Sequence, residues 1–169
     1  MAAHYNRKVV FVDETIFSRL VYAERAWHKW RHNVTVNSAL NEFRRVNVLM
    51  AVSEQHGVVG WVQTTDTMNS STLIQLLRQI DARVPRAVVF MDSCSFHRSG
   101  RTLREFGQLN LYHIFNVVRA PQLNPIEIVI NMLKQIFKKL RLVQLVLNLI
   151  IAQEITVTIA ILRLDAMKI

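Results

Sequence analysis

The chain has 169 residues, of which 51% are hydrophobic, and its formal net charge is +9. This length and apolar content predict a globular domain with a buried core and exclude an intrinsically disordered chain. Because 21 Lys and Arg residues outnumber 12 Asp and Glu residues, we expect a polyanionic partner such as a nucleic acid.

The N-terminal residues 1–8 lack the apolar core of a signal peptide, so we do not expect secretion. The lone Cys94 excludes an intramolecular disulfide and fits a reducing compartment. We therefore expect the protein in the nucleus if its source is a eukaryote and in the cytoplasm if it is a bacterium. No Gly/Ser-rich linker or repeat divides the sequence, which predicts one domain over residues 1–141 and an apolar extension over residues 142–169.

Two short apolar runs rich in Val each end in an aspartate. Residues 9–12 precede Asp13, and residues 87–91 precede Asp92. Both runs are typical of buried strands, and open sheets place their binding sites at the carboxyl ends of such strands. We therefore expect each aspartate at the tip of its strand.

Between these runs, residues 19–31 mix four basic side chains with Tyr22, Trp27 and Trp30. Such a segment can hold phosphates and stack on bases, and it can equally be a strand pair with half-buried aromatic side chains. A hairpin and a helix capped by Ser70 and Ser71 follow. The other expected ranges are 46–53 and 58–64 for the hairpin strands, 72–80 and 100–106 for helices, and 111–117 for a strand.

A longer helix is expected to begin at Pro125 and to run to about residue 141. Proline suits the first helical position because its missing N–H would have had no partner there, and Asn124 can cap the first turn. The helical period predicts one polar face and one apolar face directed at a core. The polar face carries Glu127, Asn131, Lys134, Lys138 and Arg141.

Together, Asp13, Asp92 and Glu127 form a set of hard oxygen ligands of the kind that holds Mg²⁺ or Mn²⁺. Residues 93–126, 34 in all, separate the second acid from the third. We interpret Cys94 as a small side chain behind the strand tip rather than as a nucleophile. The six His residues show no ligand-like spacing with this cysteine, so we do not expect zinc.

Three blocks of sequence resemble the catalytic domain of the mariner-like DDE transposases. They are VFVDET at residues 10–15, FMDSCSFHRS at residues 90–99 and PQLNPIE at residues 121–127. The 34-residue spacing also matches that family, as does Lys134, seven residues after Glu127. The resemblance spans about residues 8–140. It implies an α/β, ribonuclease-H-like fold with a mixed sheet flanked by helices, similar to that of retroviral integrases.

The resemblance also implies hydrolysis of a DNA phosphodiester and strand transfer with two Mg²⁺ or Mn²⁺ ions. Asp13 would bridge the two ions, while Asp92 and Glu127 would each complete one coordination sphere. His97 matches the family's histidine and either orients metal-bound water or makes a structural hydrogen bond. Asn124 either positions its turn or contacts the scissile strand. Phosphate contacts are expected from Arg98, Lys134, Lys138 and Arg141.

The chain departs from the family pattern in three places. Ser93 stands where the family usually has Asn, and Ile130 stands where it usually has an aromatic residue. Asp13 lies so near Met1 that we expect no helix-turn-helix domain before it. A second interpretation is therefore a truncated or domesticated relative that binds nucleic acid or serves as a structural subunit of a larger assembly.

The apolar stretch over residues 142–162 is interrupted by polar side chains. Among them, Glu154 alone would cost about 3 kcal/mol at the centre of a bilayer, so we do not expect a membrane span. An exposed apolar surface of this size is seldom left uncovered. We expect a buried terminal helix or a partner interface, including one between two copies of the chain.

Overall fold

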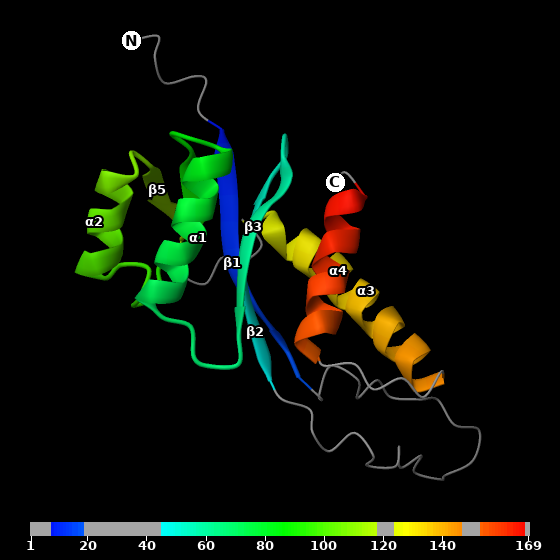
Figure 1. The fold of residues 1–169 in the computed structure, drawn as a ribbon. Coiled ribbons are helices and arrows are strands. Elements are labelled where there is room, and N and C mark those ends of the chain that lie inside the picture. The colour runs from blue at the N-terminus through cyan, green and yellow to red at the C-terminus, as the bar shows by residue number, and fades with distance from the viewer. Residues whose placement is uncertain (1–7, 19–44, 118–123, 147–152, 168–169) are drawn as a thin grey trace.

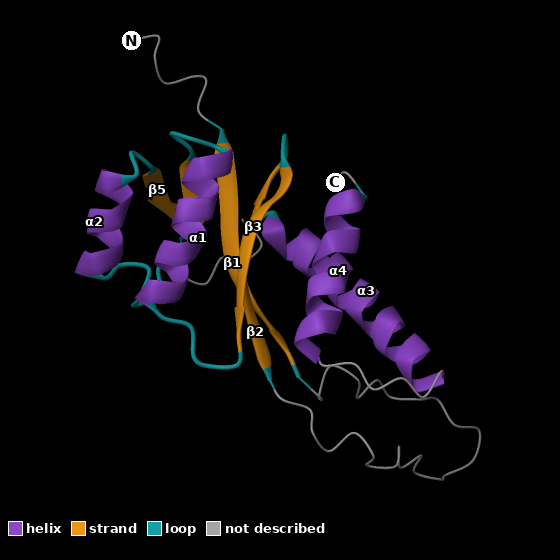
Figure 2. Ribbon diagram, in the orientation of Figure 1, coloured by secondary structure: helices purple, strands orange, loops and turns teal. Residues whose placement is uncertain are grey.

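The computed structural model describes residues 8–18, 45–117, 124–146 and 153–167. In chain order, the described elements are β1 (Val9–Phe17), β2 (Val46–Ser53), β3 (Gly57–Thr64), α1 (Ser70–Arg83), β4 (Val88–Met91), α2 (Gly100–Gln108), β5 (Tyr112–Phe115), α3 (Ile126–Val146) and α4 (Gln153–Ala166). Figure 2 shows this alternation of strands and helices. The basic and aromatic segment at residues 19–31 lies outside the described residues.

The strands form one mixed sheet in the order β3-β2-β1-β4-β5. The pairs β1–β2 and β2–β3 are antiparallel, whereas β1–β4 and β4–β5 are parallel. Figure 1 shows α1 and α2 on one side of the sheet and α3 and α4 on the other. The prediction of an α/β fold with a mixed sheet flanked by helices is therefore confirmed.

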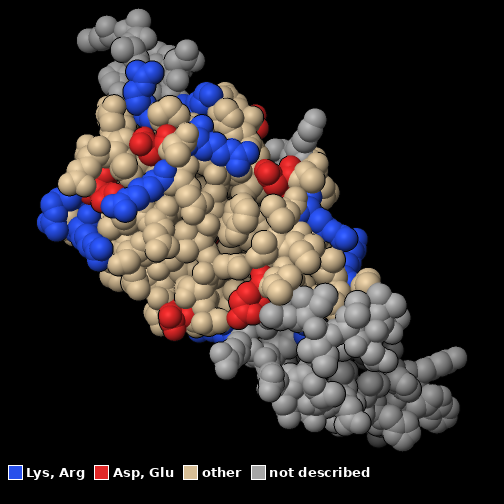
Figure 3. All heavy atoms as spheres, in the orientation of Figure 1, with Lys and Arg blue, Asp and Glu red and all other residues tan. Residues whose placement is uncertain are grey.

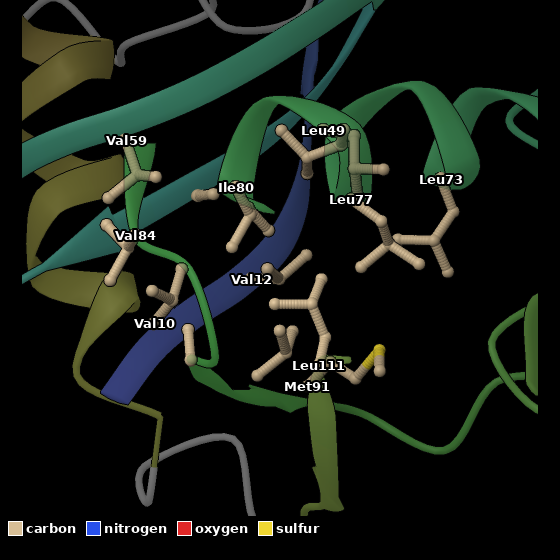
Figure 4. Close-up of a cluster of buried hydrophobic side chains, with 14 of the residues drawn as sticks. Val10, Val12, Leu49, Val59, Leu73, Leu77, Ile80, Val84, Met91 and Leu111 are labelled. Atoms are coloured by element: carbon tan, nitrogen blue, oxygen red, sulfur yellow. The ribbon is translucent and has the colours of Figure 1, made fainter. Parts of the chain in front are cut away.

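One hydrophobic core lies between the sheet and α1. Val10 and Val12 of β1 are fully buried here, because alternate residues of a strand point to the same face. Figure 4 shows them facing Leu77 and Ile80 of α1, with Met91 of β4 beside them. This packing sets the orientation of β1 and β4, and hence of the residues that follow Val12 and Met91.

The second core lies on the opposite face, between the sheet and the helix pair α3–α4. Phe17 packs against Phe137 with ring centroids 4.6 Å apart. The buried members from the two helices are Ile126, Ile130, Leu133, Phe137, Val157, Ala160, Ile161 and Leu164. The period of the α3 members is helical, so a single stripe of α3 faces the sheet.

The segment over residues 142–169 was predicted to be a buried terminal helix or an interface. In the structure, α3 continues past residue 141 to Val146, and α4 follows it. The carboxylate of Asp165 in α4 accepts a hydrogen bond of 3.1 Å from the backbone N–H of Val58 in β3. The side chains of Gln144 and Thr156 join α3 to α4 with a hydrogen bond of 2.9 Å. Within the described residues, no helix is long and apolar enough to cross a membrane.

Two predicted boundaries, the end of β1 and the start of α1, are wrong. Asp13 was expected at the tip of its strand, but β1 continues through it to Phe17 because β2 pairs with β1 up to Val46. The helix α1 begins at Ser70 rather than at residue 72. Its N-cap is Asn69, whose side-chain oxygen accepts hydrogen bonds from the backbone of the first turn.

Candidate active site

The register of the parallel pair β1–β4 brings two of the predicted acids level with each other. Phe11 pairs with Phe90, so two residues further along both strands Asp13 stands beside Asp92. Adjacent strands lie about 4.8 Å apart. Asp92 follows immediately after β4 ends, while Asp13 is still within β1.

Asp13 lies on the face of the sheet that α3 covers. Its side chain has the same strand parity as Phe11, which packs on the second core, and the opposite parity to Val12. The side-chain amide of Asn124 donates to Asp13 Oδ2 at 3.3 Å and to the carbonyl oxygen of Val12 at 3.4 Å. The start of α3, with Glu127 in its first turn, is thereby held against β1.

Of the roles expected of Asn124, the helix cap is wrong. Its side chain does not cap α3. Instead, its backbone carbonyl accepts from the N–H of Glu127 at 3.1 Å, and its side chain points to β1. The Oδ1 atom of Asn124 is buried and has no hydrogen-bond partner.

The three acids interact electrostatically. Burial raises the pKa of Asp13 from 3.8 to about 6, and the negative charges of Glu127 and Asp92 contribute to this rise. A hydrogen bond from the backbone N–H of Glu14 at 2.7 Å partly opposes it. The smallest of these influences is that of His97, which lowers the pKa of Asp13.

Asp92 has a partner of its own, because His97 Nδ1 lies 2.6 Å from its Oδ1 and 3.0 Å from its backbone carbonyl oxygen. This hydrogen bond lowers the pKa of Asp92. The turn that carries His97 is fixed by Thr102 of α2, whose hydroxyl donates to the carbonyl oxygen of Phe96 at 2.8 Å. Of the two interpretations of His97, the hydrogen bond to the site's own aspartate is the one seen here.

The chemistry of this donor set fits divalent cations that prefer oxygen. Asp13, Asp92 and Glu127 supply carboxylate oxygens, and the unpaired buried Oδ1 of Asn124 adds an uncharged oxygen beside Asp13. Among the described residues, the oxygens of the three acids do not all lie within 4.8 Å of one another.

Residues 8–150 match the protein family described as DDE superfamily endonuclease. The match covers most of the chain and includes all three acids. The chain belongs to this family. No curated protein matches it in sequence.

Solved structures place the DDE-family chain among ribonuclease-H-like folds. The simian T-cell lymphotropic virus intasome, in complex with PP2A regulatory subunit B56 gamma, gives a TM-score of 0.65 at 16% identity over 92% of this chain and 47% of that one. The Mos1 transposase catalytic domain with raltegravir and Mn gives 0.53 at 14% identity, over 74% and 57%. The Mos1 strand transfer complex gives 0.59 at 14% identity, over 96% and 52%. The chain thus spans about half the length of these proteins, and identities this low establish the fold.

The four residues predicted to bind phosphate differ in how exposed their side chains are. Arg98 is exposed beside the Asp92 turn, and Lys134 and Lys138 are half-buried along α3. Arg141 was assigned to the same polar face, and this is wrong. Its side chain is only 7% exposed and donates to Gln144 Oε1 at 2.9 Å, so it belongs to the contact between α3 and α4.

Basic side chains are spread around the molecule rather than gathered in one band on the face drawn in Figure 3. There, Lys and Arg alternate with Asp and Glu around the margin of the described part, and the centre of the face is uncharged. On this face, the described residues form no continuous basic surface.

One residue near the acids escaped the sequence analysis. Glu14 follows Asp13 in β1 and was quoted only as part of the family block, yet it has a ligand atom within 4.8 Å of both Cys94 and His97. Burial raises its pKa. The sequence did contain a signal, which is the pair of adjacent acids Asp13 and Glu14 in one strand. Adjacent side chains of a strand point to opposite faces of the sheet, so Glu14 points to the face opposite Asp13.

Proposed function

We propose that the chain is the catalytic domain of a metal-dependent DNA endonuclease of the transposase type. Its substrate is a DNA phosphodiester, which it hydrolyses to leave a 3′-OH that then attacks target DNA. The observation that carries the proposal is the convergence of Asp13, Asp92 and Glu127 from β1, the end of β4 and the start of α3. Membership of the DDE superfamily endonuclease family supports it.

Two Mg²⁺ or Mn²⁺ ions are the cofactors we propose. Asp13, Asp92 and Glu127 would hold these ions through their carboxylate oxygens, and Asp13 is the acid whose pKa both of the others raise. When bound, the ions supply Lewis-acid activation of the attacking oxygen and neutralise charge on the phosphodiester. The Mos1 catalytic domain has been solved with Mn and also with Mg.

The protein's own groups position the reaction. Asn124 holds the Asp13 carboxylate and the first turn of α3 together. His97 fixes the orientation of Asp92 through its Nδ1. The cations of Arg98 and Lys134 would hold DNA phosphates next to the acids. Their positive charges would offset the repulsion between the phosphates and the carboxylates.

Assembly through the segment at residues 142–169 is a further part of the proposal. The buried stripe of α4 is used within the chain itself. Ile155 and Leu162 are each 53% exposed on the other side of that helix, where a second copy of the chain could cover them. Paired-end complexes are described for Mos1.

The direct test is cleavage of a supercoiled plasmid by the purified chain in Mg²⁺ and in Mn²⁺. We expect nicked product with free 3′-OH ends from the native chain and a loss of at least a hundredfold in Asp92→Asn. Asp66→Asn is the matched control, because it makes the same change of charge at an exposed loop residue outside the site. Equal nicking by native protein and Asp92→Asn would refute the proposal. DNA binding without cleavage in either metal would favour the alternative of a nucleic-acid-binding relative.

A further inference from the structure

A second group of metal-ligating atoms lies next to the acids but uses a different face of β1. Glu14, Cys94 and His97 each place one ligand atom within 4.8 Å of the others. Glu14 comes from β1, and the other two come from the turn after β4. Since Glu14 and Asp13 are neighbours in a strand, their side chains leave the sheet in opposite directions. The Asp13 side chain meets Asn124 on the α3 side, so the two groups are separate.

The imidazole of His97 provides an independent sign of a ligand. Its side chain is 2% exposed, and its Nε2 is buried without a hydrogen-bond partner. Its Nδ1 faces only oxygen acceptors, the carboxylate and the backbone carbonyl of Asp92, so Nδ1 carries a proton. In the neutral ring, Nε2 then presents a lone pair. A buried lone pair left unpaired is costly, and a carboxylate that orients a histidine through its other nitrogen is the usual support for a metal-binding imidazole.

We propose that Glu14, Cys94 and His97 form a binding site for a thiophilic divalent cation, with Zn²⁺ as the best match. Nitrogen, sulfur and carboxylate oxygen are the three donor types that zinc takes in proteins, whereas Mg²⁺ and Mn²⁺ prefer oxygen alone. Zinc bonds of about 2.0–2.3 Å at tetrahedral angles put ligand atoms about 3.3–3.8 Å apart. The ligand atoms, one of them a ring nitrogen of His97, now lie within 4.8 Å of one another, so side-chain rotations that shorten these separations close the site, with water as the fourth ligand.

The positions of the three side chains make such a site accessible. Glu14 is exposed and Cys94 is half-buried, so an ion and its water can enter from solvent while the buried His97 anchors the site. Asp92 would then serve both sites, with one oxygen on His97 Nδ1 and the other available to the acid cluster. The ion would tie β1 to the turn after β4 at the point where the sheet carries its acids.

Titration of the full chain with Co²⁺, which takes the place of Zn²⁺ and is coloured, tests the site. We expect one equivalent to give the visible bands of tetrahedral cobalt and a near-ultraviolet charge-transfer band from sulfur, both removed by Zn²⁺ but not by excess Mg²⁺. Cys94 is the only cysteine, so the sulfur band reports on this residue alone. Cys94→Ser should abolish the sulfur band, and Glu14→Gln should weaken Co²⁺ binding by about tenfold or more.

Two controls separate this site from the acid cluster and from surface histidines. Asp66→Asn and Glu127→Gln should keep the full cobalt spectrum, since neither residue belongs to the group. Circular dichroism of each variant verifies that it is folded. Absence of a sulfur band in the native chain at millimolar Co²⁺ would overturn the proposal. Cobalt affinity that is unchanged in both Cys94→Ser and Glu14→Gln would also overturn it, because the ion would then be held elsewhere.

Discussion

The side-chain amide nitrogen of Asn124 lies 3.3 Å from Oδ2 of Asp13, although 111 positions separate the two residues in the chain. This contact joins the middle of β1 to the residue before α3. It brings the first turn of α3, and Glu127 with it, to the strand that carries the central acid. A residue predicted to cap a helix thus connects two of the three elements of the site.

Asn124→Ala should impair cleavage much more than folding. The substitution removes the amide that orients Asp13, and loss of an outer-shell partner of a metal ligand typically costs about 10–100-fold in activity or metal affinity. Its cost in stability should be about 1 kcal/mol, because Oδ1 of Asn124 makes no hydrogen bond. The measurements are the nicking rate and the midpoint of thermal unfolding.

Asn69→Ala is the matched control for this substitution. Asn69 caps α1, which lies on the opposite side of the sheet from α3, and loss of an N-cap costs about 1 kcal/mol. Both variants should therefore lose similar stability while only Asn124→Ala loses activity. Comparable losses of activity in both would show that the Asn124 effect is one of stability alone.

The metal-free chain should become more stable when Asp13 is replaced by Asn. The folded-state pKa of Asp13 is raised to about 6 from 3.8, so its protonated form is favoured on folding. Its contribution to stability is full below pH 3.8 and is lost as the pH rises through 6. With metal removed by a chelator, Asp13→Asn should raise the unfolding midpoint by a few degrees at pH 7.5 and leave it nearly unchanged at pH 3.5.

Added Mn²⁺ should make the native chain more stable than Asp13→Asn. A cation that binds only the folded state stabilises it by RT ln(1 + [L]/Kd), about 2.7 kcal/mol at a hundredfold excess over Kd, and only the native chain should gain this. Asp66→Asn, with the same charge change at an exposed position, should respond to the metal as the native chain does. An Asp13→Asn variant that gains as much from Mn²⁺ as the native chain would contradict the assignment of Asp13 as a ligand.

Local patterns in the sequence were sufficient for most of the fold. The hairpin over residues 46–64 and the strand before Asp92 have strong apolar runs and clear turn residues, and both are present. The length of β1 could not be predicted in this way. Residues 14–17 are strand because β2 pairs with them, and that partner comes from a distant part of the chain. The end of β1 is therefore set by its pairing with β2 and not by the strand propensity of its own residues.

For the site too, the sequence predicted some residues and not others. The three acids stood out because each lies next to the end of an apolar run or the start of a helix in the sequence, although β1 in fact continues past Asp13. The group of Glu14, Cys94 and His97 did not stand out. Zinc was not expected because only the spacing of cysteine and histidine was considered, and that spacing carries no information about an acid 80 positions before Cys94. Arg141 was misassigned for a geometric reason. It lies at the border of the polar face of α3, next to the stripe of Phe137, and α4 covers that border.

Arg141→Ala and Lys134→Ala should separate structural from DNA-binding cations. Arg141 is buried against Gln144, so its loss should destabilise the fold by about 1–3 kcal/mol and leave the salt dependence of DNA affinity unchanged. Lys134→Ala should change stability little. It should weaken DNA binding and lower the slope of log K against log salt by about 1. The checks are thermal unfolding and fluorescence anisotropy with labelled duplex at several salt concentrations.

Two adjacent residues of α4 test whether this helix is part of the chain's own core. Ile161 is fully buried against the sheet, whereas Leu162 is 53% exposed. Ile161→Ala should therefore cost about 2–5 kcal/mol in free energy of unfolding, and Leu162→Ala less than about 0.5 kcal/mol. Sedimentation of both variants would show at the same time whether Leu162 contributes to self-association. A large loss of stability in Leu162→Ala that depends on protein concentration would mean that a second copy covers this side of α4. Equal, small losses in both variants would mean that α4 does not pack on the sheet as described.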